Sequence, residues 1–372
     1  MKFKCGKLQI ANSLSNVQKF VAQKSTIPAL EGILINCANS TIELCGYNME
    51  MGITTSIPAN VQEEGRVVVN AHLFTDIIKK LSTDIAEISV DKNLNIQITG
   101  GESKFELTGI DAEEFPELPS IPKSESLELS VETLRSMIKQ TLFAVSDNDS
   151  KPVHTGTLFE IKEKSMTLVS VDGYRLALRT EPIQEDLELK FVVPGKTLKE
   201  VLRLLPADKE NELTVKISAG MRHIIFYVGD YSIISRLLNA EEFLDYQATI
   251  PEKSEHKATV STAELIDSIE RVSLLITDRL KSPIRFRFSS ESINLSCITA
   301  IGKSNDKVKA TSDLNENIET AFNNKYILEA LKNSDCDEVE IHINRVLDPI
   351  KILPKEGNSF LFLVLPVRMR AE

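Results

Sequence analysis

The sequence contains three copies of one pattern, and this repetition restricts the fold more than any other feature. In each copy, an apolar run typical of a β-strand ends at a turn or capping residue and continues as a short amphipathic helix. The three copies read VVVNAHLFTDIIKKL, FVVPGKTLKEVLRLL and TAFNNKYILEALKNS, with Asn70, Pro194 and Asn323 at their junctions. Asn is a good N-cap and Pro is tolerated at a helix start, so each copy predicts a helix from its junction onward.

A second helix is predicted near the start of each third, where apolar residues recur at helical spacing. The three apolar sets are Ile10, Leu14, Val17 and Val21; Val131, Leu134, Ile138 and Leu142; and Leu265, Ile269, Val272 and Ile276. Ser261 and Glu264 form a capping box ahead of the last set. Runs of alternating apolar residues between and after the helices predict strands. The expected fold class is therefore α+β, with two helices packed on antiparallel sheets in each repeat.

The repeat boundaries are marked by a short motif that occurs twice. Ala112-Glu113-Glu114-Phe115 recurs as Ala240-Glu241-Glu242-Phe243, and each copy is followed by a Pro-containing link. The links end at Pro122 and Pro251. We therefore expect three domains, over residues 1–122, 123–251 and 252–372.

The overall charge excludes a protein that coats nucleic acid or an anionic membrane with its whole surface. Lys and Arg number 43 against 54 Asp and Glu, for a net charge of −11. The five cysteines form no CxxC pair, the N-terminus lacks the apolar core of a secretory signal, and the apolar stretch 360–367 is too short to span a bilayer. These features predict a cytoplasmic protein with no membrane partner.

The usual catalytic and metal-binding motifs are missing from the sequence. It has no GxxxxGK[ST], HExxH or GxSxG motif, and no His lies at zinc-ligand spacing from a Cys. The paired residues Glu113 and Glu114 are candidate acid–base groups, but neighbours in an extended segment point to opposite faces. We therefore expect no catalytic residue, no metal and no cofactor. A hydrolase or transferase that uses the paired glutamates is the weakest of the alternatives.

Positive charge is concentrated at the N-terminus and on the predicted helices. The first 30 residues contain five Lys and no Asp or Glu, and five of the six helical segments are net positive; only 261–276 is net negative. This asymmetry is consistent with one surface that faces a polyanion. Ordinary amphipathic helices with Lys-rich polar faces explain it equally well. Dispersed lysines of this kind give weak, sequence-independent contacts with DNA phosphates.

Three tandem repeats, each of two helices and a sheet, resemble the bacterial sliding clamps, the β subunits of DNA polymerase III. The resemblance covers the whole chain. It runs through the segments STIPALEGILI (25–35), GYNMEM (46–51), GTLFE (156–160), VDGYRLAL (171–178), FVVPGK (191–196) and LVLPVRM (363–369), of which VDGYRLAL and LVLPVRM are the specific ones.

The resemblance implies the DNA-clamp fold and a head-to-tail homodimer that closes into a ring around double-stranded DNA. Such a protein is a processivity factor and not an enzyme. Its expected partners are DNA, without sequence preference, and proteins that carry a clamp-binding peptide: the DNA polymerase III catalytic subunit, the clamp loader, other polymerases and repair proteins.

The family's peptide pocket, carried over by motif, lies between the second and third repeats. Its expected residues are Val171, Gly173, Tyr174, Arg175, Leu176, Pro349, Leu363, Val364, Leu365, Pro366, Val367 and Arg368. The apolar walls of such a pocket suit Leu and Phe anchors, with Arg175 and backbone groups fixing their orientation. Two positions depart from the family, because His154 stands where Leu is common and Leu244 stands where Pro is common. Without the resemblance, LVLPVRM is simply the last strand and VDGYRLAL a strand–turn–strand.

The resemblance also implies a dimer seam between the first and third repeats. We expect Phe105 and Leu107 to meet Leu274 and Leu275 there, with the cores of the individual domains as the alternative place for these side chains. The expected DNA-facing residues are Lys24, Lys139, Lys151, Lys196, Lys199 and Arg203. A repeat scaffold that binds only proteins stays open as a second function.

Overall fold

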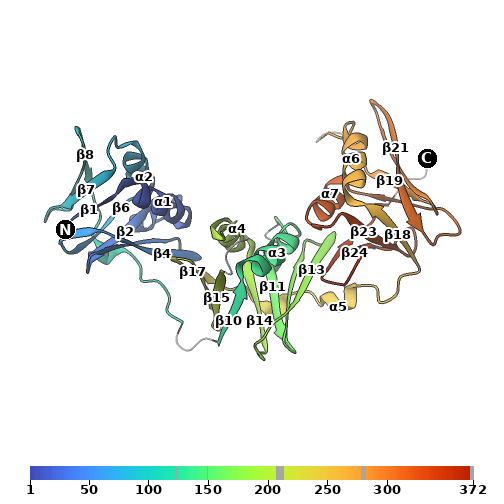
Figure 1. Ribbon diagram of the computed structural model, residues 1–372, viewed down its shortest axis with the longest axis horizontal. Coiled ribbons are helices and arrows are strands. Elements are labelled where there is room, and N and C mark those ends of the chain that lie inside the picture. The colour runs from blue at the N-terminus through green and yellow to red at the C-terminus, as the bar shows by residue number, and fades with distance from the viewer. Residues whose placement is uncertain (122–124, 149, 207–212, 278–281, 369–372) are drawn as a thin grey trace. The chain divides into compact units, whose positions relative to one another are not determined.

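The computed structural model describes residues 1–121, 125–148, 150–206, 213–277 and 282–368, and the chain divides into two compact units (Figure 1). The first unit joins Met1–Val131 to Lys199–Leu237, and the second joins Glu132–Leu198 to the chain from Leu238 onward. The strand pairs in both units are antiparallel. The α+β class and the packing of helices on antiparallel sheets are therefore confirmed.

The first unit contains two sheets. The five-stranded sheet has the order β5 (Asn60–Glu63), β1 (Lys2–Gly6), β7 (Ile85–Val90), β8 (Asn95–Gly100) and β9 (Ser103–Thr108). The eight-stranded sheet has the order β10 (Glu125–Ser130), β15 (Thr214–Ala219), β16 (His223–Val228), β17 (Tyr231–Arg236), β4 (Met51–Pro58), β3 (Thr41–Tyr47), β2 (Gly32–Ala38) and β6 (Gly65–Asn70).

The helices of the first repeat form where the repeat pattern predicts them. Helix α1 (Lys7–Val17) packs beside α2 (Ala71–Lys80). The Asn70 side chain caps α2 by accepting a hydrogen bond from the backbone N–H of Leu73 at 2.9 Å, as its junction position predicts. The C-terminal basic pair of α2, Lys79 and Lys80, lies at the negative end of the helix dipole. Both helices bury their predicted apolar faces.

The second unit contains one sheet of twelve strands. Its order is β14 (Leu189–Pro194), β11 (Gly156–Lys162), β12 (Ser165–Val171), β13 (Arg175–Pro182), β25 (Phe360–Val364), β24 (Ile350–Pro354), β23 (Glu338–Ile343), β18 (His256–Ser261), β21 (Gly302–Ser312), β20 (Ser292–Thr299), β19 (Ile284–Phe288) and β22 (Ile318–Phe322). The short helix α5 (Tyr246–Thr249) follows the second AEEF motif.

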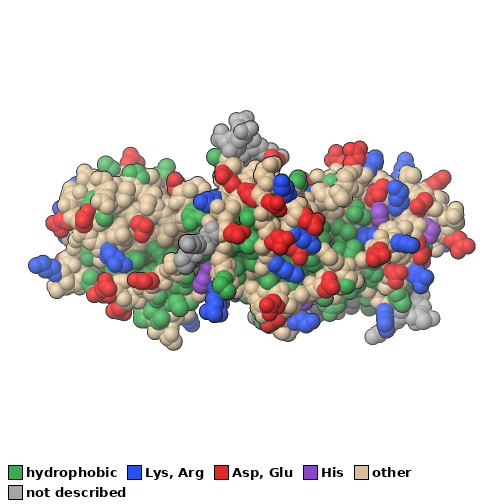
Figure 2. Space-filling view, turned by 90° about the horizontal axis from the view of Figure 1, so that it is seen from below, with side chains coloured by type: hydrophobic (Ala, Val, Ile, Leu, Met, Phe, Trp, Pro, Cys, Tyr) green, Lys and Arg blue, Asp and Glu red, His purple; other side chains and the backbone are tan. Residues whose placement is uncertain are grey.

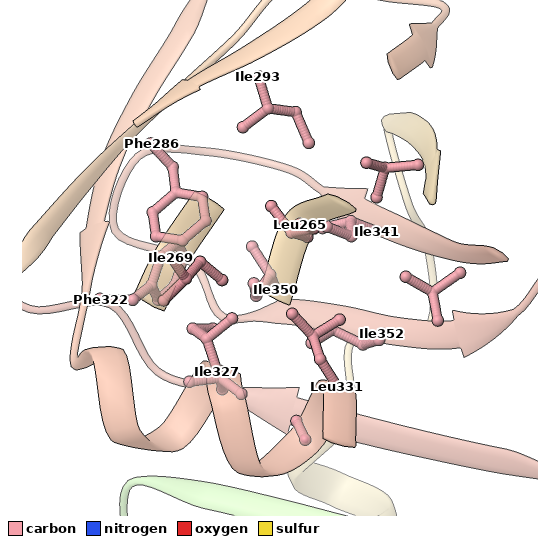
Figure 3. Close-up of a cluster of buried hydrophobic side chains, with 14 of the residues drawn as sticks. Leu265, Ile269, Phe286, Ile293, Phe322, Ile327, Leu331, Ile341, Ile350 and Ile352 are labelled. Carbon is pink, nitrogen blue, oxygen red and sulfur yellow. The ribbon is translucent and has the colours of Figure 1, made fainter. Parts of the chain in front are cut away.

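Helices α6 (Thr262–Ser273) and α7 (Asn324–Lys332) close the main core of the second unit. Figure 3 shows side chains from both helices and from the sheet pointing toward one another in this core. Leu265 and Ile269 come from α6, and Ile327 and Leu331 from α7. The predicted cap of α6 is present, because Ser261 Oγ accepts a hydrogen bond from the Glu264 backbone N–H.

The middle repeat is divided between the two units. Its helices α3 (Val131–Leu142) and α4 (Gly195–Leu204) each cross the division. The division falls there because strands of neighbouring repeats pair with each other: β4 pairs with β17, and β13 pairs with β25. The expected domain boundaries stay predictions, and the boundary at residues 122 and 123 lies outside the described residues.

The AEEF motifs correct one expectation about local structure. Both form single turns of 3-10 helix, η3 (Ala112–Glu114) and η5 (Ala240–Glu242), and not extended segments. Asp111 caps the first turn and Asn239 the second, because each side chain accepts from a backbone N–H two residues later. The polar capping residue ahead of each motif is the signal for this turn that the extended reading overlooked.

The described residues contain neither a membrane-spanning helix nor a group of metal-ligating side chains. None of the helices in the described ranges combines the length and apolar character needed to cross a bilayer. The same residues contain no cluster of three or more His, Cys, Asp or Glu side chains arranged to hold a metal ion.

Candidate functional site

The VDGYRLAL segment forms a tight turn between β12 and β13. Asp172 Oδ1 accepts hydrogen bonds from the backbone N–H groups of Tyr174 (2.9 Å) and Arg175 (3.0 Å). Gly173, between Asp172 and Tyr174, has a φ of 90°, in the region where glycine avoids the strain that a side chain causes. The turn leaves Tyr174 exposed and directs Arg175 inward.

Arg175 is the most heavily bonded side chain of the predicted pocket. It is only 7% exposed. Its Nε donates to Asp172 Oδ2 at 2.9 Å, its Nη2 donates to the Phe143 carbonyl at 2.6 Å, and its Nη1 pairs with the Glu329 carboxylate. The guanidinium also lies over the rings of Phe143 and Tyr326, at 5.4 and 4.7 Å from their centroids. These contacts join the residue that follows α3, the helix α7 and the turn, so Arg175 braces the site from within.

The apolar members of the predicted pocket form a buried floor. Val171, Leu176 and Leu363 pack in one cluster with Phe243 and Tyr246. Burial and a 2.6 Å hydrogen bond from its hydroxyl to Glu160 raise the pKa of Tyr246 to about 12, so this phenol stays neutral. The segment that follows the second AEEF motif therefore contributes to the site, and it contains Leu244, one of the two positions at which the chain departs from the family.

An apolar ledge, made by Tyr174, Leu365 and Val367, adjoins this floor. Their exposed fractions are 61%, 38% and 39%. The Leu365 N–H donates to the Tyr174 carbonyl at 2.9 Å, and the Val367 N–H donates to the Ala321 carbonyl at 2.7 Å. The segment 365–367 that follows β25 is thus held by main-chain hydrogen bonds, while the side chains of Leu365 and Val367 remain available to a ligand.

The remaining residues of LVLPVRM lie at or beyond the end of β25. Val364 is the last residue of the strand and is buried, whereas Pro366 follows it and Arg368 is exposed. Pro349 precedes β24 and is half-buried. Because β25 lies between β13 and β24, it is an interior strand, and the proline is tolerated because it lies past the last ladder bond. Met369 lies outside the described residues.

A cavity of about 600 Å³ opens beside the turn. It is lined by Val145, Ser146, Asp147, Asn148, Ser150, Lys151, His154, Asp172, Gly173, Tyr174, Arg175, Lys325 and Tyr326. His154 is 9% exposed, and its ring makes a T-shaped contact with the ring of Phe243, with 5.6 Å between centroids. Burial, together with the nearby charge of Lys151, lowers the pKa of His154 below its usual value. Sequence reasoning missed Tyr326 and Glu329, which lie on the repeat helix α7, and Phe143, which directly follows α3.

The expected DNA-facing cations are exposed but belong to both units. Lys24, Lys199 and Arg203 lie in the first unit, and Lys139, Lys151 and Lys196 lie in the second. Arg203 is partly neutralised, since its Nε donates to Glu200 at 2.8 Å and its Nη1 donates to Asn16 Oδ1 at 2.7 Å. The face shown in Figure 2 carries basic and acidic side chains interspersed.

The expected dimer residues lie beside open strand edges. Phe105 and Leu107 are on β9, which ends the five-stranded sheet, and Phe105 is 37% exposed. Leu274 caps the C-terminus of α6 and is 80% exposed, while Leu275 is half-buried. In the second unit, β21 pairs with β18 only through residues 310–312. Within the described strands, residues 302–309 pair on one side only, with β20.

Comparison with known proteins covers the whole chain. Residues 1–119 match the N-terminal domain of the DNA polymerase III beta subunit, residues 128–245 its central domain, and residues 247–368 its C-terminal domain. A protein of Staphylococcus epidermidis described as a beta sliding clamp is 31% identical, with 99% of both chains covered.

Two solved structures extend the likeness to the fold. The DNA polymerase sliding clamp of Bacillus subtilis is 30% identical, with a TM-score of 0.95 and 100% of both chains covered. A putative DNA polymerase III beta subunit from Eubacterium rectale is 31% identical, with a TM-score of 0.93 and 99% of both chains covered. The three family matches follow one another in the order that the triple repeat predicts. The chain therefore belongs to the DNA polymerase III beta subunit family, the beta sliding clamps, and is built of three tandem clamp domains.

Proposed function

We propose that this protein is a non-catalytic processivity factor of DNA replication that works in the cytoplasm. A head-to-tail homodimer encircles duplex DNA and tethers DNA-processing proteins through a peptide pocket. The observation that carries this proposal is the full-length match to beta sliding clamps, together with an apolar ledge and cavity at the two most specific motifs.

The ring would be closed by the open strand edges. Within the described sheets, strand β9 and residues 302–309 of β21 each have one side without a neighbouring strand, and such an edge is a template for pairing with a second chain. Phe105, Leu107, Leu274 and Leu275 add apolar surface beside these edges. Two chains joined head to tail use two such seams, so the heterologous contact closes on itself. The domain boundaries proposed for the six-domain ring are residues 1–122, 123–251 and 252–372 of each chain.

Contacts with DNA would be weak and independent of sequence. Exposed lysines on α3 and α4, with Lys24, Lys151 and Arg203, would neutralise phosphates without reading bases. Because a closed ring is held on DNA by topology, strong local affinity is unnecessary, and a chain of net charge −11 remains compatible with the role.

The ledge and its floor would bind peptides that carry Leu and Phe anchors. The DNA polymerase III catalytic subunit, the clamp loader, other polymerases and repair proteins are the partners expected to carry such segments. Arg175 supports the walls of this pocket by joining α7 to the turn after β12. The proposed pocket residues are therefore of two kinds, those that contact the peptide and those that hold the contacting residues in place.

Retention on circular DNA tests the topological part of the proposal. The protein is loaded onto a nicked plasmid by the clamp loader of the same organism and separated from free protein by gel filtration. Cutting the plasmid with a restriction enzyme should release the protein, whereas a mock digestion with an enzyme that lacks a site should not. Equal retention on circles and linear DNA would contradict the ring, and peptide binding without any retention would favour a protein-only scaffold.

Removal of the tail tests the pocket. A chain that ends at Leu365 loses Pro366, Val367 and Arg368 but keeps all of β25. Sedimentation should still give a dimer, and stimulation of the cognate polymerase should be abolished. Full stimulation by the shortened chain would show that the pocket lies elsewhere.

A further inference from the structure

His154 interrupts a likeness between the first two repeats. The 3-10 turn η2 (Pro28–Glu31) and the turn η4 (Pro152–Thr155) both lead into a strand that begins with glycine. Leu30 in the first turn holds the place that His154 holds in the second. Leu30 packs in an apolar cluster with Phe115, and His154 packs on Phe243, the corresponding residue of the second AEEF motif. The second repeat thus places an imidazole where the first places an aliphatic side chain.

The polar ring atoms of His154 form no hydrogen bond with the part of the chain that the structure describes. The backbone N–H of His154 donates to the Lys151 carbonyl, and its carbonyl accepts from the Ser146 N–H. For the ring nitrogens, the structure records no hydrogen bond with any described residue. The ring is nine-tenths buried and lines the cavity, and its nitrogens are not among the fully enclosed, unbonded polar atoms of the described residues, so they reach the space of the cavity. A ligand that enters the cavity meets an unused hydrogen-bonding group.

The free charge around this cavity is positive. Asp172 is occupied by Arg175 and by two backbone N–H groups, and Arg175 in turn is paired with Glu329. Among the described residues that line the cavity, the charged groups that remain are Lys151, Lys325 and one acid, Asp147. Lys325 has only a 4.0 Å approach to Glu329, which is a weak ion pair at an exposed position. The two lysines therefore favour an anionic group beside the imidazole.

We propose that the His154 cavity binds the carboxylate of an acidic residue in a partner peptide whose apolar anchors lie on the neighbouring ledge. This inference rests on the proposed function, because it deepens the peptide site. His154 would donate a hydrogen bond to the carboxylate, and Lys151 and Lys325 would add charge complementarity at the rim. The cavity then selects partners by a polar contact that the apolar floor cannot make.

Binding of this kind takes up a proton. His154 is neutral at neutral pH in the free protein because burial and Lys151 hold its pKa below the ordinary value of 6.5. A carboxylate at hydrogen-bond distance favours the imidazolium form, so the bound state holds the proton more tightly. Since the peptide carboxylate stays ionised down to pH ~5, acidic peptides should bind more tightly as the pH falls toward about 6.

The test uses the full-length protein and fluorescein-labelled synthetic peptides that share a Leu-Phe pair. One series moves a single Glu through the positions before that pair, and matched series carry Gln or Leu in its place. Fluorescence anisotropy should show one position at which Glu binds roughly tenfold more tightly than Gln near pH 6, with a smaller preference near pH 8.

Three variants separate the outcomes. His154→Leu should abolish the preference for Glu while peptides with Leu at that position still bind, and His154→Gln should abolish the pH dependence. His223→Leu, which changes a half-buried histidine of the first unit, should alter neither. A preference for Glu that survives in His154→Leu, or its absence at every position, would overturn the inference and leave the peptide site intact. Failure of every peptide to bind would overturn both.

Discussion

The first and second repeats build the same turn and use it differently. Asn48 Oδ1 accepts hydrogen bonds from the N–H groups of Glu50 and Met51 at 3.0 and 2.9 Å, as Asp172 does for Tyr174 and Arg175. The residue that follows the capping Asn48 or Asp172 has a positive φ in both turns, 71° at Met49 and 90° at Gly173. The two turns therefore share one backbone conformation and differ in their side chains.

The strands that follow the two turns are also alike. The Arg236 N–H donates to the Glu50 carbonyl at 2.8 Å, and the Leu365 N–H donates to the Tyr174 carbonyl at 2.9 Å. In the first repeat, however, Met51 stands where the second has Arg175. The second turn is therefore tied to a helix of another repeat through an ion pair, and the comparison teaches that a few side chains distinguish the proposed site from the same backbone frame in the first repeat.

Replacing Arg175 of the second turn by Met, the residue at the same place in the first turn, should have the largest effect on stability. Arg175→Met leaves the Phe143 carbonyl without its donor and Asp172 without its ion pair. We expect a loss of about 3 kcal/mol in the free energy of unfolding, because a buried charge network is broken. Urea denaturation measures this. The matched control, Arg203→Met, removes an exposed ion pair and should cost less than ~1 kcal/mol; equal losses in the two variants would disprove the bracing role of Arg175.

Replacing Leu30 of the first repeat by His, the residue at the same place in the second repeat, should have the next largest effect on stability. Leu30→His places an imidazole in an apolar cluster, and we expect a loss of about 2 kcal/mol. The loss should grow as the pH falls below about 6.5, since the unfolded chain then binds a proton that the buried ring resists. Denaturation at several pH values checks this. An unchanged stability would mean that the Leu30 site tolerates polar groups, and that the comparison with His154 carries no meaning.

Removing glycine from the second turn should lower the stability of the protein, whereas adding glycine to the first turn should not. Gly173→Ala places a side chain at a φ of 90° with no neighbouring atom within 4 Å of its Cβ, so only backbone strain acts, and we expect a loss of about 1 kcal/mol. Met49→Gly relieves the same strain and should be neutral or slightly stabilising. Denaturation midpoints of both variants decide the question, and a destabilised Met49→Gly protein would show that the exposed Met49 side chain makes contacts that matter.

The smallest expected effect is the pH dependence that His154 gives to stability. Its folded-state pKa is lowered by burial, so below the unfolded value of ~6.5 the unfolded chain binds more protons than the folded chain. The stability contributed by the neutral ring is present above that value and decreases as the pH falls through it. His154→Leu should flatten the stability profile between pH ~7.5 and ~5.5, while changing the exposed His72 to Gln should not.

Local sequence signals determined the helices, their caps and the turns of this protein. Asn70 and Ser261 cap the helices that they precede, and the strand–turn–strand of VDGYRLAL forms as its pattern indicates. These features depend on contacts between residues a few positions apart, which a sequence displays directly. The resemblance to the clamp family likewise rested on short motifs in a fixed order.

Only the tertiary structure decided how the repeats join and what the site contains. Because β4 pairs with β17 and β13 pairs with β25, the division between the two units falls inside the middle repeat. No local sequence pattern predicts this pairing between repeats. The bonds from Arg175 to Phe143 and Glu329, and the cavity around His154, likewise join residues far apart in the chain. The partners in such contacts are chosen by packing and by the need to satisfy buried polar groups, which emerge only after the chain has folded.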